Sequence, residues 1–433
     1  MLKLTGAAVG RDALGANTTG TQNTAVGSLA LDANTTADAN TAIGYDAATA
    51  LVTGGYNVAL GHSAMIANAT GVNNVAIGYQ TLNNNASPTA NVAIGYRACK
   101  NNNSNYGVFI GDRAASNGIV GGEKNTAVGH YSLFALTTGA YNTSLGANTL
   151  SLNTTASNNT AVGYAAMNTN STGANNTAVG SGALMENTTA ANNTAFGKDA
   201  LKVNTTGSNN TAVGYAALDA TTTGSENTAV GASALGANTT GYQNVAMGRF
   251  AGNLITDGYE NTAIGYRALR SNTTGTSNTA VGYDTLRVST TVSNCTALGY
   301  RACEENTTGD SNTGLGSEAL REITTGAKNT AVGSGALFAN TTGNNNVAVG
   351  RNALDASTTT NNNTAIGTES LTANTSGTHN AACGYATLEA NTTGSYNTAL
   401  GSVALLSVTT ASSNTGLGYN AGRSITTLSL IHI

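Results

Sequence analysis

The 433-residue sequence has few charges, few aromatic residues, one proline and no tryptophan. Charged residues make up 9% of the chain, and the net charge of -4 comes without a basic stripe, so we expect no nucleic-acid partner. No apolar run reaches the length of a membrane span. The four cysteines lack the paired spacing of a disulfide framework or a zinc site. We therefore expect no metal and no cofactor.

What the sequence has instead is a 17-residue repeat. A residue that is usually Ala, an apolar residue and a glycine recur in 25 copies, with the glycines running from Gly10 to Gly418. The one irregularity is a spacing of 16 followed by 18 around Gly111. A short fixed period over a whole chain predicts a stack of identical units. The strict apolar positions argue against disorder, although charge is low.

Each unit opens with a short strand candidate, which is Asn-Thr-Ala-Val at residues 23–26. Asn leads this strand in 22 of the 25 copies, which predicts a ladder of side-chain hydrogen bonds along the stack. An apolar residue precedes each glycine and another follows it by four positions. We expect a corner at the glycine that directs both into one core. The expected structural ladders contain Asn23, Asn40, Asn159, Val26, Ile43, Val162, Gly27, Gly44, Gly163, Leu31 and Leu184.

A 17-residue unit is too short for a pair of helices, and its Thr, Asn and Gly disfavour helix. We therefore expect an all-β parallel β-solenoid of about 25 coils, one repeat per coil, over residues 1–423. Residues 424–433 leave the repeat, and we interpret them as a tail that is a sequencing artefact or a truncation point. No signal peptide precedes the first repeat, so we expect that export uses another route, as for a virion protein, or that the true N-terminus is missing. Because neither end shows a capping unit, we interpret the chain as an internal fragment.

Strand alternation places Asn23 and Ala25 on one face, and Thr24 and Val26 on the other. On both faces, only a few residue types occur across the copies. One Val-type and one Leu-type residue per coil is a modest core against the ordering entropy of 17 residues. We therefore expect parallel copies to cover the Ala25 face in a homotrimer. Single chains that stack end to end into a filament are the alternative.

Two recurring surface motifs suggest contacts with glycans. Tyr follows the glycine in ten copies, three of them consecutive (Tyr266, Tyr283 and Tyr300). These rings either bind sugars or pack on one another, and we favour packing. Asn-x-Thr sequons recur in the turns, where they are glycan acceptors or plain turns, and we favour turns. The sequons include Asn17, Asn34, Asn187 and Asn391.

The sequence offers little for catalysis. A glycosidase needs two carboxylates about 5–10 Å apart, and only Glu304 and Glu305 cluster, in a variable turn. Charges of both signs two residues after the glycine indicate a solvated face. We expect no enzyme, with a glycan depolymerase as the alternative from a different class. An ice-binding rod is a distant alternative, because Val replaces the strand Thr in several copies.

The cysteines are interpreted as structural. Cys99 and Cys303 take the Leu position and Cys383 takes the Val position, so all three read as small core residues. Cys295 replaces an Asn of the strand ladder.

The unit NTAVGYxALxxNTTG, seen well at residues 210–227, 261–278 and 278–293, resembles the repeats of bacterial and phage tail-fibre-domain proteins. More distantly, the Ala-Val/Ile-Gly step resembles the head of trimeric autotransporter adhesins. The resemblance implies a left-handed β-roll that assembles as a trimer. It also implies the shaft of an extracellular appendage or a phage tail fibre, which attaches to a surface or glycan. The implied location is extracellular, at a cell surface or on a virion.

Overall fold

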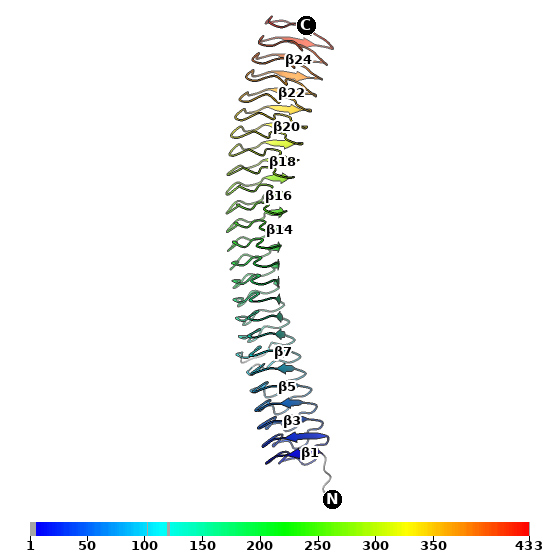
Figure 1. Cartoon of the computed structure of the whole chain (residues 1–433), viewed down its shortest axis with the longest axis vertical. Helices are drawn as coiled ribbons and strands as arrows, with labels where there is room; N and C mark the ends of the chain where they lie inside the picture. The colour runs from blue at the N-terminus through cyan, green and yellow to red at the C-terminus, as the bar shows by residue number, and fades with distance from the viewer. Residues whose placement is uncertain (1–5, 102, 119–121, 433) are drawn as a thin grey trace. The chain divides into compact units, whose positions relative to one another are not determined.

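The computed structural model describes residues 6–101, 103–118 and 122–432. In this part of the chain all regular structure is β, with 25 short strands and no helix. The chain forms two compact units, Met1–Tyr215 and Ala216–Ile433. Within each unit successive strands stack as parallel neighbours, one per 17-residue repeat (Figure 1). The predicted parallel β-solenoid is confirmed.

The strands are three or four residues long and recur once per coil. Those of the first unit are β1 (Gly6–Val9), β2 (Asn23–Val26), β3 (Thr41–Ile43), β4 (Val58–Leu60), β5 (Val75–Ile77), β6 (Val92–Ile94), β7 (Val108–Ile110), β8 (Thr126–Val128), β9 (Thr143–Leu145), β10 (Thr160–Val162), β11 (Thr177–Val179), β12 (Thr194–Phe196) and β13 (Thr211–Val213). Those of the second are β14 (Thr228–Val230), β15 (Val245–Met247), β16 (Thr262–Ile264), β17 (Thr279–Val281), β18 (Thr296–Leu298), β19 (Thr313–Leu315), β20 (Thr330–Val332), β21 (Val347–Val349), β22 (Thr364–Ile366), β23 (Ala381–Cys383), β24 (Thr398–Leu400) and β25 (Thr415–Leu417).

The register pairs each strand residue with the residue one repeat later, such as Ala161 with Ala178. The spacing of 16 and then 18 changes nothing in the sheet, because Val108 still pairs with Val92 on one side and Thr126 on the other. The two irregular lengths are therefore absorbed outside the strands.

The predicted corner at the glycine is present. Gly27 has φ 130°, in a region that L-residues rarely adopt. A Cβ placed on it would lie 2.4 Å from the carbonyl oxygen of Gly44 in the next coil. Both the backbone angle and the close approach of neighbouring coils therefore require glycine here.

Each coil also holds non-glycine residues in the left-handed region, which the sequence analysis did not anticipate. In the second coil they are Leu29 (φ 61°), Leu31 (φ 52°) and Ala39 (φ 59°). A β-branched residue in this region is a strong outlier. In the described part of the chain, Val403 is the one β-branched residue with positive φ. Val, Ile and Thr are nearly absent from these positions, and this is the feature of the sequence that indicated positive φ angles there.

The inner and outer faces of the strands are opposite to the prediction. Ala25 is fully buried, whereas Val26 is 37% exposed and Ile43 is 39% exposed. Val162 is half-buried. The predicted core position of Val26, Ile43 and Val162 is therefore wrong. The predicted homotrimer contact through the Ala25 face is wrong as well, because that face lines the interior of the coil.

The physical reason is the small space behind the sheet. A Cβ on Gly314, which stands in the Ala position of β19, would lie 2.7 Å from the Cys303 sulfur. The opposite wall supplies Leu31 and its equivalents, which are fully buried as predicted. With a Leu reaching across, there is room for only a methyl group on the strand. The inward strand position is therefore limited to small residues. The other strand position faces outward.

One coil tests this volume argument within the same chain. In β7 the Ala position is taken by Phe109, which is fully buried. Its Leu position holds Ala115, also fully buried. Its Asn position holds Gly107, where a Cβ would lie 2.3 Å from the Phe109 ring. A large residue on the strand is thus accommodated by smaller residues at two neighbouring positions.

After β25 the described tail keeps the backbone register of the repeat. Thr415 pairs with His432, and the Ile431 N–H donates to Asn414 Oδ1 at 3.1 Å. The Ser412 N–H likewise donates to Ser429 Oγ at 3.2 Å. The side chains after residue 423 leave the repeat, but the backbone of residues 429–432 follows the preceding coil.

Candidate functional site

The predicted asparagine ladder is present inside the coils. Asn261 donates from Nδ2 to Asn244 Oδ1 (3.1 Å) and to the Gly275 carbonyl oxygen (2.9 Å). Its own Oδ1 accepts the N–H of Asn278 at 3.1 Å. Side-chain amides thus satisfy buried backbone groups that no strand partner reaches. The other residues named for this ladder, Asn23, Asn40 and Asn159, are buried in the same way.

The sequons form a second internal ladder, which the sequence analysis did not identify. Asn34, Asn187 and Asn391 are fully buried. Asn187 Nδ2 donates to Asn170 Oδ1 (2.8 Å) and to the Ala190 carbonyl oxygen (3.0 Å). An N-linked glycan attaches to this same nitrogen, so the folded coil leaves it no room at these three positions. Asn17, in the first coil, is half-exposed and donates to the Gly20 carbonyl oxygen.

A third set of side chains links the outer turns. Asp38 Oδ1 accepts the Thr21 N–H (2.6 Å) and the Thr21 hydroxyl (2.9 Å). These two donors, the backbone N–H first, lower the pKa of Asp38. Serines take the same role further on, where the Ser395 N–H donates to Ser412 Oγ at 3.0 Å. Where this position holds a short polar residue, its side chain therefore joins one turn to the one before it.

The three consecutive tyrosines form a stacked ladder. Tyr266 and Tyr283 have centroids 5.4 Å apart, and Tyr283 and Tyr300 have centroids 5.6 Å apart. The Arg267 guanidinium lies over the Tyr266 ring and that of Arg301 over the Tyr300 ring, at 4.8 and 5.0 Å. Ring faces are thus covered by other rings and by arginine, and mainly edges and hydroxyls face outward. This geometry supports ring packing, because a sugar stacks on a free ring face.

A second ladder of stacked rings contains a histidine. His62 lies between Tyr45 (5.2 Å) and Tyr79 (5.3 Å), and Tyr79 stacks on Tyr96 at 5.4 Å. All four residues directly follow the repeat glycine. Their shared position was the signal that placed His62 among the tyrosines.

Beside the tyrosine ladder lies a network of ion pairs centred on Glu304. Its side chain is 5% exposed and meets Arg287 at 2.9 Å, Arg321 at 3.3 Å and Arg301 at 3.7 Å. The neighbouring Asp284, 1% exposed, receives two hydrogen bonds from Arg267 at 2.7 and 2.6 Å. The predicted solvated face is therefore wrong at Asp284, which lies two residues after a repeat glycine and is covered by Arg267 of the preceding coil.

This network does not resemble a hydrolytic site. Glu304 meets three guanidinium groups. Glu305 meets one of the same guanidinium groups, that of Arg287, at 3.2 Å, and its side chain is 43% exposed. A glycosidase needs one protonated and one ionised carboxyl group on either side of a cleft. The two glutamates do not share such a cleft, so the geometry gives the depolymerase alternative no support.

No disulfide bond joins the four cysteines, which all lie in the described part of the chain, and three of the four are buried. Burial raises the pKa of Cys99 to about 12 and that of Cys295 to about 11, and it raises the pKa of Cys303 as well. These thiols act as core residues. Cys383, at the Val position of β23, is half-buried and faces outward, which corrects the prediction that it lies in the core.

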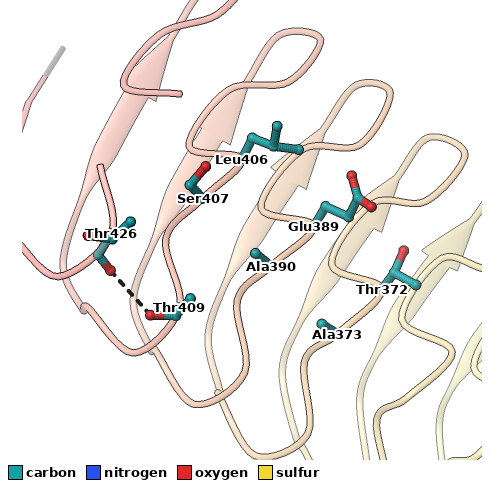
Figure 2. Close-up of a pocket in the computed structure, with 8 residues that line it drawn as sticks. All are labelled: Thr372, Ala373, Glu389, Ala390, Leu406, Ser407, Thr409 and Thr426. Carbon is teal, nitrogen blue, oxygen red and sulfur yellow. Dashed lines mark hydrogen bonds between the residues drawn. The ribbon is translucent and has the colours of Figure 1, made fainter. Parts of the chain in front are cut away.

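The second unit carries a groove of about 590 Å³ across its last coils. Figure 2 shows Thr372, Glu389 and Leu406 in one row, Ala373, Ala390 and Ser407 in a parallel row, and the Thr409–Thr426 hydrogen bond at one end. The lining contains one carboxylate and several hydroxyls. It provides neither a pair of carboxylates nor a nucleophile with a neighbouring base.

The described ranges lack two further kinds of feature. They contain no group of three His, Cys, Asp or Glu side chains placed to hold a metal ion. No helix long and apolar enough to cross a membrane occurs in them. Comparison with known proteins gave no match, either to a protein-family model or to a curated protein.

Proposed function

We propose that this chain is a non-catalytic structural protein, a segment of the shaft of an extracellular fibre. The observation that carries the proposal is the continuous bonding between coils. Within each unit, neighbouring coils are joined by the strand backbone and, in many coils, by the Asn261-type ladder, the sequon ladder and the turn residues. The described residues of such a stack place many polar side chains where they hold neighbouring coils together.

A shaft has to resist proteases and local unfolding, and both depend on the free energy of local opening. Opening one coil here breaks backbone and side-chain bonds on both sides at once. The resemblance of the repeat to tail-fibre-domain proteins supports the same role and suggests a bacterial appendage or a phage tail fibre. We extend the proposal to attachment at a cell surface or to a glycan, for which the exposed tyrosine edges are candidate contacts.

The first test is physical. The purified chain should show a β-type circular dichroism spectrum, appear elongated in negative-stain electron microscopy and resist a broad-specificity protease for hours. Rapid cleavage at many turns under native conditions would contradict a shaft role.

The second test addresses catalysis. Incubation with bacterial surface polysaccharides should leave their chain length unchanged, as measured by size-exclusion chromatography. Depolymerisation that is lost in Glu304→Gln would replace the structural proposal with an enzymatic one. A glycan array probed with the intact chain identifies any sugar that is bound without being cleaved.

A further inference from the structure

Two tyrosines of the second unit form a ring stack outside the two ladders described above. Tyr242 and Tyr259 hold the same position in consecutive repeats, each directly after a glycine. Their ring centroids lie 4.8 Å apart and their ring planes are inclined by 3°. The other stacked tyrosine pairs of the described residues have centroids 5.4, 5.4 and 5.6 Å apart and planes inclined by 11°, 24° and 17°. Tyr242 and Tyr259 are therefore the closest and most nearly parallel of these pairs.

The backbone fixes the separation of the two rings. The Glu260 N–H donates to the Tyr242 carbonyl oxygen at 3.1 Å, which joins the two coils directly beside the rings. A Cβ placed on Gly241 would lie 2.4 Å from the carbonyl oxygen of Gly258, so the two chain segments are also in close contact just before the rings. The rings are thus held one coil apart, close to the separation of about 4.8 Å between neighbouring strands.

The surroundings leave this pair open. Tyr242 is 43% exposed and Tyr259 is half-buried. The same position in the two flanking coils holds Ser225 and Thr276, so neither flanking residue adds a third ring to the stack. Arg249, which lies between the two tyrosines in the sequence, covers Phe250 instead.

The tyrosine ladder of Tyr266, Tyr283 and Tyr300 differs in this respect. Arginine guanidinium groups lie over the Tyr266 ring at 4.8 Å and over the Tyr300 ring at 5.0 Å. A positive charge over an aromatic ring interacts with its electron-rich face and opposes the removal of an electron from that ring. The chain therefore contains one open tyrosine pair and one ladder covered by cations, in the same unit.

We propose that Tyr242 and Tyr259 are the site of an intrachain dityrosine cross-link, formed by a haem peroxidase with hydrogen peroxide. Each phenol gives up one electron and one proton, and the two tyrosyl radicals join through a bond between ring carbons ortho to the oxygens. Each joined carbon then loses its proton and each oxygen takes one up, which restores both phenols. One molecule of peroxide receives the two electrons and the two protons and becomes two molecules of water.

The stack favours this bond because it holds the two reacting groups together in advance. The rings are nearly parallel and come from equivalent positions of the repeat, so equivalent carbons are separated by about the distance between the centroids. Holding two reactants at close distance makes their coupling effectively unimolecular. The partly exposed side chains have room to tilt toward each other as the bond forms.

The link would be a covalent clamp across one coil. It would close the 17-residue repeat between the two tyrosines into a ring, which restricts the opened state as a disulfide over a loop of similar length does. A shaft functions with or without such a clamp, so the cross-link goes beyond the proposed function and is tested separately.

The experiment treats the full chain with a haem peroxidase and hydrogen peroxide, then denatures it and digests it with trypsin. Cleavage after Arg249 places the two tyrosines in separate peptides, residues 203–249 and 250–267. Mass spectrometry should find these two peptides joined and lighter than their sum by two hydrogen atoms, with the blue fluorescence of dityrosine. When chains labelled with heavy nitrogen are mixed with unlabelled chains, each joined pair should carry one isotope throughout, because the link forms within a chain.

Two matched variants separate this site from the rest of the chain. Tyr242→Phe keeps a ring in the stack and removes one phenol, so it should abolish the joined peptides while the circular dichroism spectrum stays that of wild type. Tyr283→Phe takes one phenol from the middle of the arginine-covered ladder, and it should leave the yield of the joined peptides unchanged.

Three results would overturn the proposal. They are joined peptides at the wild-type yield in Tyr242→Phe, a link found only between differently labelled chains, and an oxidised chain in which residues 203–249 and 250–267 are not joined. None of these results bears on the shaft function, which is judged from the shape and protease resistance of the untreated chain.

Discussion

Ala25 and Val26 are adjacent on β2 and lie on opposite sides of the coil wall, with Ala25 fully buried and Val26 37% exposed. The smaller of the two is inside because Leu31 already crosses the interior from the opposite wall. Val26, the larger residue, is outside, where its own coil does not limit the size of the side chain. This relationship recurs along the described chain and decides which strand substitutions disturb the core.

Ala25→Leu should destabilise the fold. The added methylenes have no space beside Leu31 and Ala30, which are both fully buried, and overpacking of this kind costs about 1–3 kcal/mol. A lower thermal midpoint by circular dichroism is the expected result. Val26→Leu, one residue away and outward, serves as the control and should leave the midpoint nearly unchanged. Equal shifts for the two variants would mean that the faces are wrongly assigned.

Leu320→Ile should be more damaging than its unchanged volume suggests. Leu320 is fully buried at φ 53°, where a β-branched side chain is strained, so we expect a loss of about 2 kcal/mol or more. The reverse exchange Ile323→Leu, also fully buried but without a positive φ, should cost less than about 1.5 kcal/mol. Hydrogen exchange of this coil, followed by mass spectrometry, compares the two. Similar protection in both variants would speak against backbone strain.

Asn261→Asp should make stability depend on pH. The site is 1% exposed and its Nδ2 donates to the Gly275 carbonyl oxygen, so a carboxylate there loses a donor and buries a charge. Burial raises the folded-state pKa of the new carboxyl group above its unfolded value near 3.9. The folded state then binds the proton more tightly, so stability is highest below about pH 4 and falls as pH rises.

Thermal midpoints of Asn261→Asp and wild type, measured between pH 4 and 8, give the difference directly. The gap should widen with increasing pH. Asn261→Leu serves as the control, because it removes the same hydrogen bonds without a titrating group and should lower the midpoint by a similar amount throughout. A gap in Asn261→Asp that does not change with pH would show that the carboxyl group is not held in the ladder.

Glu304→Gln should destabilise the second unit by about 1–3 kcal/mol, because it leaves three arginines around a neutral amide. Glu305→Gln removes one exposed pair and should cost less than about 1 kcal/mol. Urea midpoints of both variants at low and high salt distinguish the two sites. Added salt should largely erase the small effect of Glu305→Gln and leave most of the effect of Glu304→Gln. Equal urea midpoints for the two variants would show that Glu304 is not the centre of the ion-pair network.

The sequence by itself determined the period, the parallel register, the glycine corner and the Asn23-type ladder. Each of these follows from a local rule that repetition enforces. A residue type that recurs at one position must meet the same requirement of backbone angle or hydrogen bonding in every coil. The inward position of Leu31 was also predictable, since a large apolar residue recurs there with few substitutions.

Only the tertiary structure decided which strand face lies inside. Ala25 and Val26 alternate in the same way under either assignment, and the choice depends on how much space Leu31 leaves once the coil has closed. The second ladder through Asn34 and the burial of Glu304 have the same origin. Asn187 of that ladder donates to Asn170, and Arg287 and Arg321 meet Glu304, in each case across one full repeat, so these contacts exist only when neighbouring coils are stacked. Sequence patterns report which positions are constrained, and the closed coil determines whether the constraint comes from the core or from the surface.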